Sequence, residues 1–181
     1  MINIAKRILP ILLIIAGLSA CEKPLFQNNQ KTTETRIIHK DFTTINLFDH
    51  FDVFLCEDTI NIITLEGSAH LLEKVKTFID DTVLVIKDEN TANWYKPVER
   101  IKVYLHFKPV LRINIKGQNN IFSLDTLYGI PGRYFKFSVQ SEITKIDVKI
   151  HIERLFLMSV WYATRDLNIS GYAPNTAIYI R

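Results

Sequence analysis

This sequence has few of the residues, and none of the motifs, that usually mark a catalytic centre. Its 181 residues include two cysteines and five histidines, and the histidines are scattered along the chain. Phosphate-binding loops, dinucleotide-binding fingerprints, paired-histidine zinc motifs and nucleophile-elbow patterns are all absent. We therefore predict that the protein is not an enzyme and that it has no catalytic residues, no cofactor and no metal.

An excess of charge of one sign is also missing. The formal net charge is +3, and two of those positive charges are Lys6 and Arg7, which leaves +1 for the rest of the chain. Proteins that bind nucleic acid usually carry a pronounced basic patch or stripe. The charge balance therefore gives no reason to expect nucleic acid as a partner.

The N-terminus has the pattern of an export signal. A basic pair precedes an apolar run, Ile8 to Leu18, of about 11 residues, which is signal-peptide length and too short to cross a bilayer. Leu18-Ser19-Ala20-Cys21 then resembles a bacterial lipobox, in which a peptidase cuts before the cysteine and a diacylglycerol is attached to its sulfur. We predict a signal peptide over residues 1–20 and lipidation of Cys21. The alternative is an ordinary signal sequence with a chance cysteine.

A lipidated Cys21 would anchor the protein to the bacterial cell envelope, and we expect the outer membrane, on its periplasmic or its surface face. Cys56 would then have no partner for an internal disulfide, and we expect it to be a small packed residue. Residues 21–35 are polar and lack periodicity, which predicts a tether. Residues 36–181 have the size of a single domain.

The first half of this domain is predicted to contain strands and one short helix. Residues 42–86 contain alternating apolar and polar positions that predict strand, strand, strand, helix, strand. The helix is predicted from Leu71, Leu72 and Val75, which would share one helical face. The alternation from Ile101 to Phe107 predicts another strand.

The second half contains a repeat of about 22 residues. Three sets of similar residues recur at this step: Ile113, Phe135, Phe156 and Ile178; Ile115, Phe137, Met158 and Ile180; and Leu124, Ile146 and Leu167. Stacked units that bury one apolar side against their neighbours produce such a pattern. We predict an all-β fold, a β-solenoid or parallel β-helix-like domain with one short helix in its N-terminal half.

The apolar spacings also carry a family resemblance over residues 36–181. They comprise Phe42-x-x-Ile45, Phe51-x-Val53, Leu65-Glu66-Gly67, Leu71-Leu72, Leu84-x-Ile86 and Ile101-x-Val103, followed by the repeats. With this order the chain resembles the putative auto-transporter adhesin, head GIN domain family, a domain of unknown function in Bacteroidetes lipoproteins. The resemblance implies a non-catalytic adhesin or binding domain for a glycan or a surface protein.

Acidic side chains form one candidate for a metal-binding or catalytic site. The repeat would stack Asp125, Asp147 and Asn168, with Lys145 and Lys149 on the same face as Asp147. A solvated ladder balanced by the lysines is the preferred interpretation, and a calcium site is the alternative, because calcium needs six to eight oxygen ligands. An acid pair at Asp125 and Asp147 would also be the minimum for a β-helical enzyme acting on polysaccharides. The sequence Asp49-His50-Phe51-Asp52 could suggest a metal site, but in a strand Asp49 and Asp52 would point to opposite faces, so a turn is the preferred interpretation.

Two other features concern modification and ligands. Asp-Thr followed by an apolar residue occurs at Thr59, Thr82 and Thr126, and each resembles the O-glycan acceptor of exported Bacteroidetes proteins. The alternative is that Asp-Thr simply begins a strand after a turn. A sugar-stacking surface could be formed by six aromatic residues: Tyr104, Tyr134, Trp161, Tyr162, Tyr172 and Tyr179.

The final residues predict an exposed solenoid end. Residues 176–181 begin a fourth repeat, and Leu155-Phe156-Leu157-Met158 before it is apolar on both faces. If Phe156 and Met158 face the core, Leu155 and Leu157 face outward. An uncapped end exposes unpaired backbone and apolar surface. Three explanations are open: a truncated member of the family, a tail that folds back as a cap, or an interface with another copy. An interface or a truncation is preferred to a cap, and the interface predicts self-association through the end, as a homo-oligomer or a structural protomer.

Overall fold

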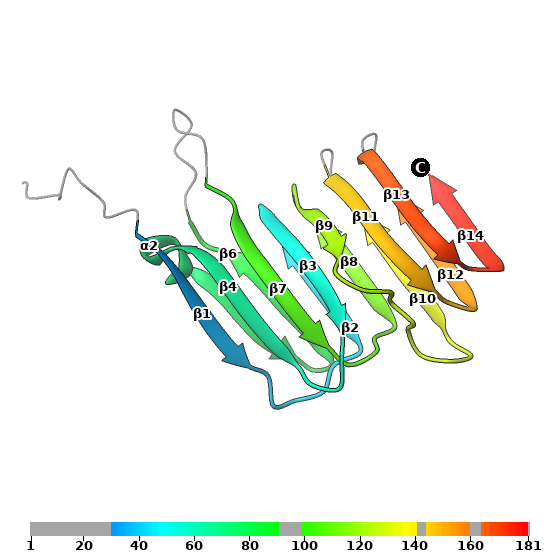
Figure 1. Cartoon of the computed structure of the whole chain (residues 1–181), viewed down its shortest axis with the longest axis horizontal. Coiled ribbons are helices and arrows are strands. Elements are labelled where there is room, and N and C mark those ends of the chain that lie inside the picture. The colour runs from blue at the N-terminus through cyan, green and yellow to red at the C-terminus, as the bar shows by residue number, and fades with distance from the viewer. Residues whose placement is uncertain (1–29, 91–98, 141–143, 160–163, 181) are drawn as a thin grey trace, which may run out of the picture.

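A computed structural model describes residues 30–90, 99–140, 144–159 and 164–180. The described chain is nearly all-β and forms two seven-stranded sheets that face each other (Figure 1). Sheet A contains, in spatial order, β1 (Lys31–Ile37), β4 (Ile62–Ser68), β7 (Ile101–Phe107), β3 (Phe51–Glu57), β9 (Asn120–Ser123), β11 (Thr144–His151) and β13 (Thr164–Tyr172). Counted from the other end of the molecule, where β13 ends sheet A, the strands of sheet B are, in spatial order, β14 (Asn175–Ile180), β12 (Arg154–Ser159), β10 (Tyr134–Val139), β8 (Arg112–Lys116), β2 (Thr44–Phe48), β6 (Val83–Asp88) and β5 (Val75–Asp80).

Both sheets are mixed. From β6 to β14 successive strands alternate between the sheets, and the strands from β8 to β14 pair in parallel with all their neighbours. The strands β1, β4 and β7 pair antiparallel, as do β5 and β6. β2 and β3 lie between strands that follow them in the sequence, so the spatial order departs from that of a simple solenoid. The predicted all-β class is confirmed, and the topology is that of two mixed sheets.

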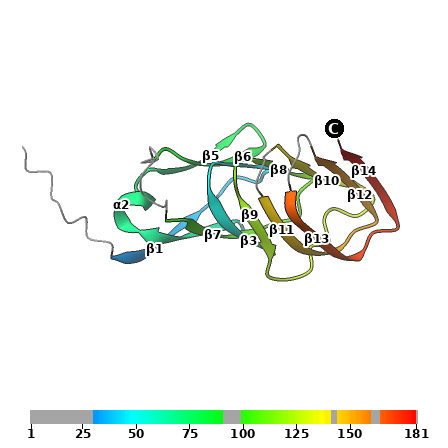
Figure 2. The same cartoon turned by 90° about the horizontal axis from the view of Figure 1, so that it is seen from above.

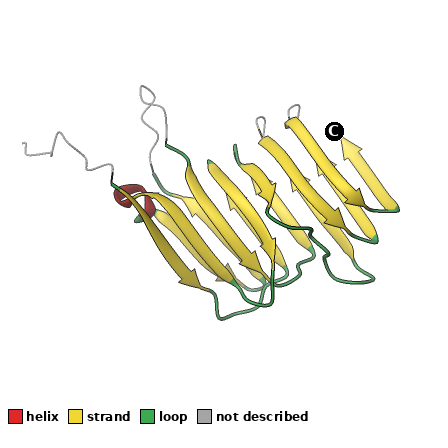
Figure 3. Cartoon of the chain, viewed as in Figure 1, coloured by secondary structure: helices red, strands yellow, loops and turns green. Residues whose placement is uncertain are grey.

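The short helix is smaller than the sequence suggested. α2 (Ala69–Leu72) is a single turn that connects sheet A to sheet B (Figure 3). Val75, which was expected on the same helical face as Leu72, is instead the first residue of β5, and its side chain is buried. In the segment 75–80, one buried and two half-buried positions alternate with exposed ones, which is the pattern of a strand with one face toward the core.

The chain enters the sheet earlier than residue 36. β1 begins at Lys31 and pairs along its whole length with β4, from Lys31–Ser68 to Ile37–Ile62. Residues 31–35 were predicted to belong to the tether because they are polar. An edge strand exposed on its outer face can be polar, because only its inward positions meet the core.

The predicted register of the repeat is wrong in sheet B. Ile113 is paired with Phe137 rather than Phe135, and Phe137 is paired with Leu157 rather than Met158. The assumed constant step fails because residues 124–133 lie between β9 and β10, whereas only two residues separate β11 from β12 and β13 from β14. A shift of one residue exchanges the two faces of a strand.

The corrected register reverses the faces of β12. Leu155 and Leu157 are each 4% exposed and point into the core, while Phe156 and Met158 are half-buried on the outer face. The sequence prediction placed these two pairs the other way round. Four consecutive apolar residues fit either face, so the pattern alone could not select one.

The second set of repeat strands is partly as predicted. Ile146 is paired with Leu167, and Asp147 with Asn168, which confirms the predicted alignment of β11 with β13. On the other side Ile146 is paired with Ile121, and Asp147 with Phe122, so the predicted alignment with residues 124 and 125 is wrong.

The core fills the space between the sheets, as the view from above shows (Figure 2). Its buried side chains belong to residues 42–157, with Ile38, Ile169 and Ala173 packed against them. Connections between sheets pack closely as well: the backbone of Asp49 lies where a Cβ on Gly117 would be. The buried amide of Asn119 accepts a hydrogen bond from the N–H of Phe51 at 3.0 Å.

Candidate functional site

Three aromatic side chains lie in register on the outer face of sheet A. Phe54 of β3 is paired with Tyr104 of β7 on one side and with Phe122 of β9 on the other. The ring centroids are 4.9 Å apart for Phe54 and Tyr104, and 5.3 Å for Phe54 and Phe122, with interplanar angles of 16° and 22°. We call these three residues the aromatic row. They face outward because alternate residues of each strand, such as Val53 and Leu55, are buried.

The rings are stacked, which determines what they present to solvent. Neighbouring strands lie about 4.8 Å apart, so aromatic residues paired across several strands must overlap. All three side chains are half-buried. The row therefore forms a continuous apolar ridge across the middle of the sheet. The outer ring faces of the row lie at its two ends, on Tyr104 and on Phe122, and Lys145 Nζ lies over the ring of Phe122.

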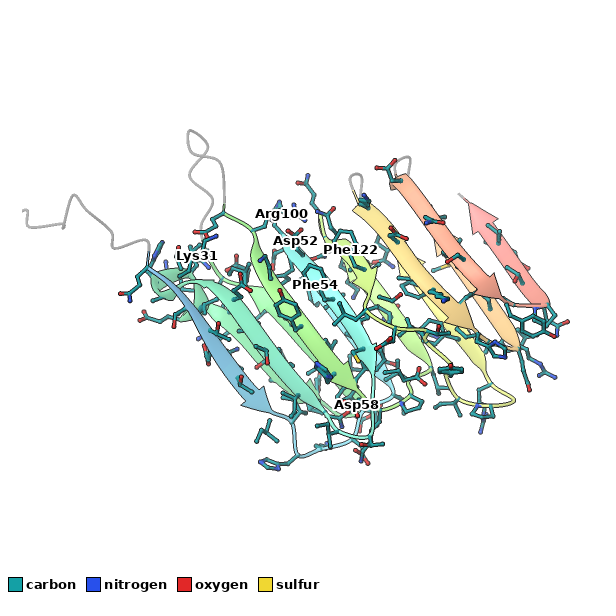
Figure 4. All side chains as sticks on the ribbon, viewed as in Figure 1. Lys31, Asp52, Phe54, Asp58, Arg100 and Phe122 are labelled. Atoms are coloured by element: carbon teal, nitrogen blue, oxygen red, sulfur yellow. The ribbon has the colours of Figure 1, made fainter. Side chains whose placement is uncertain are left out.

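A polar row runs beside the aromatic row, two residues earlier in β3, β7 and β9 and therefore on the same face. Lys102 Nζ donates to Glu66 Oε1 at 2.7 Å, and the Tyr104 hydroxyl donates to Glu66 Oε2 at 3.3 Å. Arg100 Nε donates to Asp52 Oδ1 at 2.7 Å, and Asn120 Nδ2 donates to the same oxygen at 2.8 Å. Figure 4 shows Asp52, Arg100, Phe54 and Phe122 grouped on this face.

Ion pairing fixes the charges of the polar row. The hydrogen bond from Lys102 holds the pKa of the Glu66 carboxyl below its ordinary value, and Glu66 in turn raises the pKa of Lys102. Arg100 is held additionally by the carbonyl oxygen of Phe51 at 3.0 Å. Donors and acceptors of defined position therefore border the apolar ridge.

The side of the ridge toward β11 carries a cation. Lys145 Nζ lies over the ring of Phe122, 5.9 Å from its centroid. A lysine over an aromatic face is attracted by the negative potential of the ring. Asp147, in register with Phe122, accepts a hydrogen bond from Asn168 Nδ2 at 2.9 Å.

The far end of β3 carries a second group of polar residues. His106 Nδ1 lies 3.2 Å from Asp58 Oδ2. The backbone N–H of Thr59, and then His106, lower the pKa of Asp58. Burial, followed by the nearby Asp125 and Asp58 carboxylates, raises the pKa of the Cys56 thiol. Cys56 is half-buried on the outer face, and its thiol is poorly suited to act as a nucleophile at neutral pH.

The acidic residues proposed from the repeat are not stacked. Asp125 lies in a bend after β9, with its Oδ2 4.0 Å from Cys56 Sγ, whereas Asp147 lies beside Phe122. In the described parts of the chain, no three His, Cys, Asp or Glu side chains are placed to share a metal ion. The acid pair that polysaccharide hydrolysis would need is therefore not formed by these two aspartates.

The three candidate acceptor threonines lie in connections near the surface. Thr59 and Thr82 are exposed, in the β3–β4 connection and in the β5–β6 turn, and Thr126 is half-buried after β9. Asp58 Oδ1 accepts hydrogen bonds from the Thr59 N–H at 2.6 Å and from its hydroxyl at 3.3 Å. Their modification stays a prediction.

Cys21, the predicted lipidation site, lies outside the described residues. No helix within the described ranges is both long and apolar enough to cross a membrane. The turn predicted at Asp49 is present, and Asp49 has a positive φ of 69°.

The six aromatic residues proposed from the sequence do not form one surface. Tyr104 belongs to the aromatic row, but Tyr134 and Tyr179 are on sheet B, and Tyr172 stacks on His151 with centroids 5.1 Å apart. Trp161 and Tyr162 lie outside the described residues. Phe54 and Phe122 were missed. The signal for Phe54 was present, because it occupies a polar-face position in an alternating strand.

Comparison with known proteins places this architecture in a family. Residues 41–174 match the family model described as "Putative auto-transporter adhesin, head GIN domain". This chain belongs to that family. No curated protein matches it significantly.

Solved structures share the head GIN fold at low sequence identity. A protein from Bacteroides fragilis described as a putative adhesin is similar with a TM-score of 0.61 and 12% identity, over 72% of this chain and 59% of that one. Putative adhesins from Parabacteroides merdae and Parabacteroides distasonis have TM-scores of 0.51 and 0.52, with 14% and 15% identity. Both alignments cover 74% of this chain, and they cover 62% and 58% of those proteins, respectively. The head GIN chain thus spans about three fifths of the length of these relatives.

Proposed function

We propose that this protein is a non-catalytic envelope lipoprotein that binds a glycan, or a surface partner presenting one, through the aromatic and polar rows of sheet A. The observation that carries the proposal is the register of Tyr104, Phe54 and Phe122 beside the polar row. A pyranose ring has an apolar C–H face and a rim of hydroxyl groups. An apolar ridge bordered by fixed donors and acceptors suits both parts of such a ligand.

The polar row supports the same ligand class. Glu66 and Asp52 offer carboxylate oxygens, and Lys102, Arg100 and Asn120 offer N–H groups, all close to the ridge. Charge-assisted hydrogen bonds are stronger than neutral ones, and hydroxyl groups can both donate and accept. The ion pairs keep these side chains ordered before binding, which lowers the entropy lost on binding.

The cell-surface role agrees with the family. Its description and those of the solved relatives name adhesins rather than enzymes. The lipobox-like Leu18-Ser19-Ala20-Cys21 supports anchoring in the outer membrane, and the parallel ladders from β8 to β14 support a solenoid-like domain carried on that anchor. The chemistry for a polysaccharide-acting enzyme has less support, because Asp125 and Asp147 lie apart in register.

A glycan array with a chain that begins at residue 22 tests the proposal. This chain retains every described strand, since the first begins at Lys31. We expect binding to a subset of glycans, and a loss of about tenfold or more in Phe54→Ala, because that change removes both ring contacts at the centre of the row. Phe156→Ala is the matched control: Phe156 is also half-buried and stacked on a tyrosine, Tyr179 at 5.1 Å, but on sheet B.

The two variants separate the outcomes. Binding that survives Phe54→Ala but not Phe156→Ala would move the site to sheet B and contradict the proposal. The absence of binding to any glycan by the unmodified chain, with normal thermal unfolding, would also contradict it.

A further inference from the structure

A hollow on the outer face of sheet B, on the opposite side of the sandwich from the aromatic row, is lined by cations. Its volume is about 470 Å³, which is within the range of pockets that hold small organic ligands. We call it the cationic hollow. The lining includes four cations and one aromatic ring, and none of its described lining residues is acidic: Arg112, Arg133, Lys136, Arg154 and Tyr134.

Three parallel strands bring these side chains together. Arg112 of β8 is paired with Lys136 of β10, and Arg154 of β12 is paired with Tyr134, two residues before Lys136. Side chains two residues apart on a strand point to the same face, so all four lie on the outer face of sheet B. Two strand spacings are about 9.6 Å, so Arg112 and Arg154 flank β10 closely enough to reach one group above it from both sides.

A tight turn adds the fourth cation. The N–H of Arg133 donates to the carbonyl oxygen of Ile130 at 3.1 Å, with Pro131 and Gly132 at the two central positions. Gly132 has a positive φ of 71°, as the third position of a type II turn requires, and glycine adopts it without strain. The turn fixes the start of β10 and places Arg133 at the hollow.

Two of the cations are held over aromatic rings. Lys136 Nζ lies 5.5 Å from the ring centroid of Phe156, and Arg154 Cζ lies 5.6 Å from that of Tyr134. A ring attracts a cation through its quadrupole and carries no net charge, so these contacts order the side chains without neutralising them. Tyr134 is 49% exposed, so its ring also presents apolar surface at the hollow.

The positive charge of the hollow is not neutralised by the described parts of the protein. Within those parts, the four cations form no ion pair, and Glu153, just before β12, does not line the hollow. On sheet A, by contrast, Arg100 and Lys102 are each paired with a carboxylate. Arg112 and Lys136 are in register, and like charges in that position repel each other. A bound anion would remove this repulsion.

The charge and the side-chain types of the hollow fit a phosphate group. A carboxylate carries one negative charge, whereas a phosphate monoester carries about 1.5 to 2 at neutral pH. Guanidinium groups donate paired hydrogen bonds to phosphate oxygens, and three of the four cations are arginines. The hollow is larger than a phosphate ion, and the ring of Tyr134 offers an apolar surface to the part of the ligand that carries the phosphate.

We propose that the cationic hollow binds the phosphate monoester group of a phosphorylated sugar, with Arg112 and Arg154 on either side of the phosphate. Lys136 and Arg133 add charge, and the apolar face of the sugar lies against Tyr134. This site is additional to glycan binding by sheet A, and neither depends on the other. A free sugar phosphate and a lipid headgroup present the same chemical group, so the experiment has an arm for each source.

Calorimetric titration of the chain from residue 22 with glucose 1-phosphate and with glucuronate tests the ligand class. We expect binding of glucose 1-phosphate that weakens as the salt concentration rises, and about tenfold weaker binding of glucuronate, which has a carboxylate in place of the phosphate. Co-sedimentation with phosphatidylcholine vesicles, with and without monophosphoryl lipid A, tests a lipid-borne sugar phosphate. Equal binding of glucuronate and glucose 1-phosphate would overturn the phosphate assignment.

Variants at exposed or half-buried outer positions test the residues without disturbing the core. Arg112→Gln should weaken binding about tenfold, and Arg154→Lys should weaken it several-fold, because lysine keeps the charge but lacks the planar fork. Lys136→Gln should also weaken binding. Its matched control is Lys149→Gln, which removes the same charge from an exposed position of β11 on sheet A and should change binding by less than about twofold.

The outcomes separate this site from the one on sheet A. Binding of either the soluble ester or the lipid-containing vesicles that Arg112→Gln weakens and Phe54→Ala retains supports the proposal, and the form that binds identifies the source. The proposal is overturned if neither form binds, if Lys149→Gln weakens binding as much as Lys136→Gln, or if Phe54→Ala abolishes it. Neutral glycans carry no phosphate, so their binding to sheet A succeeds or fails independently of these results.

Discussion

Truncation of Leu157 tests the register of β12, on which the assignment of the core depends. In the structure Leu157 points inward, pairs with Phe137 and Ile178, and is 4% exposed. Met158 follows it on the outer face and is half-buried. The register expected from the sequence repeat requires the opposite, with Met158 in the core. Leu157→Ala and Met158→Ala therefore give opposite results in the two registers.

The size of the effect follows from the burial. Alanine lacks three carbon groups of leucine, and at about 0.8 kcal/mol per buried methylene their loss costs about 2.4 kcal/mol. A rigid cavity would add to this figure, and Leu→Ala changes reach about 5 kcal/mol in well-packed cores. Leu157 borders an open groove between β13 and β14, where the cavity can be filled from the side. We therefore expect about 2.5 kcal/mol for Leu157→Ala, and less than about 1 kcal/mol for Met158→Ala.

Urea unfolding followed by circular dichroism measures both variants. With a slope of about 2 kcal/mol per M, the midpoint of Leu157→Ala should fall by about 1.2 M. All samples should be compared at one low protein concentration, so that association does not contribute to stability. If Met158→Ala lowers the midpoint more than Leu157→Ala, the register of β12 is wrong.

Four further predictions concern charge, modification and metal. The hydrogen bonds from Arg36 lower the pKa of Glu34 below its ordinary 4.5, so the ionised pair stabilises the fold above that pH and the contribution is lost as the pH falls through the lowered pKa. Glu34→Gln should thus cost less than about 1 kcal/mol at pH 7, because Glu34 is partly exposed, and progressively less as the pH falls through the lowered pKa; a difference that does not change with pH would refute the argument. Cys21→Ala should leave the precursor uncut and unlabelled by a clickable palmitate analogue, whereas labelling that persists would exclude this lipidation site. Intact mass from the native host should exceed the sequence mass by hexose-like increments, which disappear stepwise on alanine substitution of Thr59, Thr82 and Thr126. Millimolar calcium should leave the melting temperature unchanged; an upward shift that Asp147→Ala abolishes would instead indicate a calcium site.

Local patterns in the sequence predicted much of the strand content. The alternation from Ile101 to Phe107 corresponds to β7, and the apolar positions of residues 51–55 correspond to the buried face of β3. These predictions succeed because the side-chain period of a strand is a local property of the chain. They failed where the local pattern was ambiguous, as at Val75, whose spacing from Leu71 and Leu72 suits a helix as well as a strand start.

The candidate site could be predicted only in part, for a different reason. Phe54, Tyr104 and Phe122 are far apart in the sequence, and each alone resembles an ordinary exposed aromatic residue. They become a row because β3 is inserted between β7 and β9, out of sequence order. The repeat extended only through the later strands and therefore could not reveal that insertion.

The sequence by itself determined the all-β class, the family and the strand periodicity, because short-range alternation and spacing encode them. The tertiary structure alone decided which strands are neighbours and which face of β12 is buried. Loop lengths such as residues 124–133 set the register between strands, and a shift of one residue exchanges inner and outer faces. Leu155-Phe156-Leu157-Met158 is compatible with both faces, and only packing against Phe135 and Phe137 selects the leucines for the core.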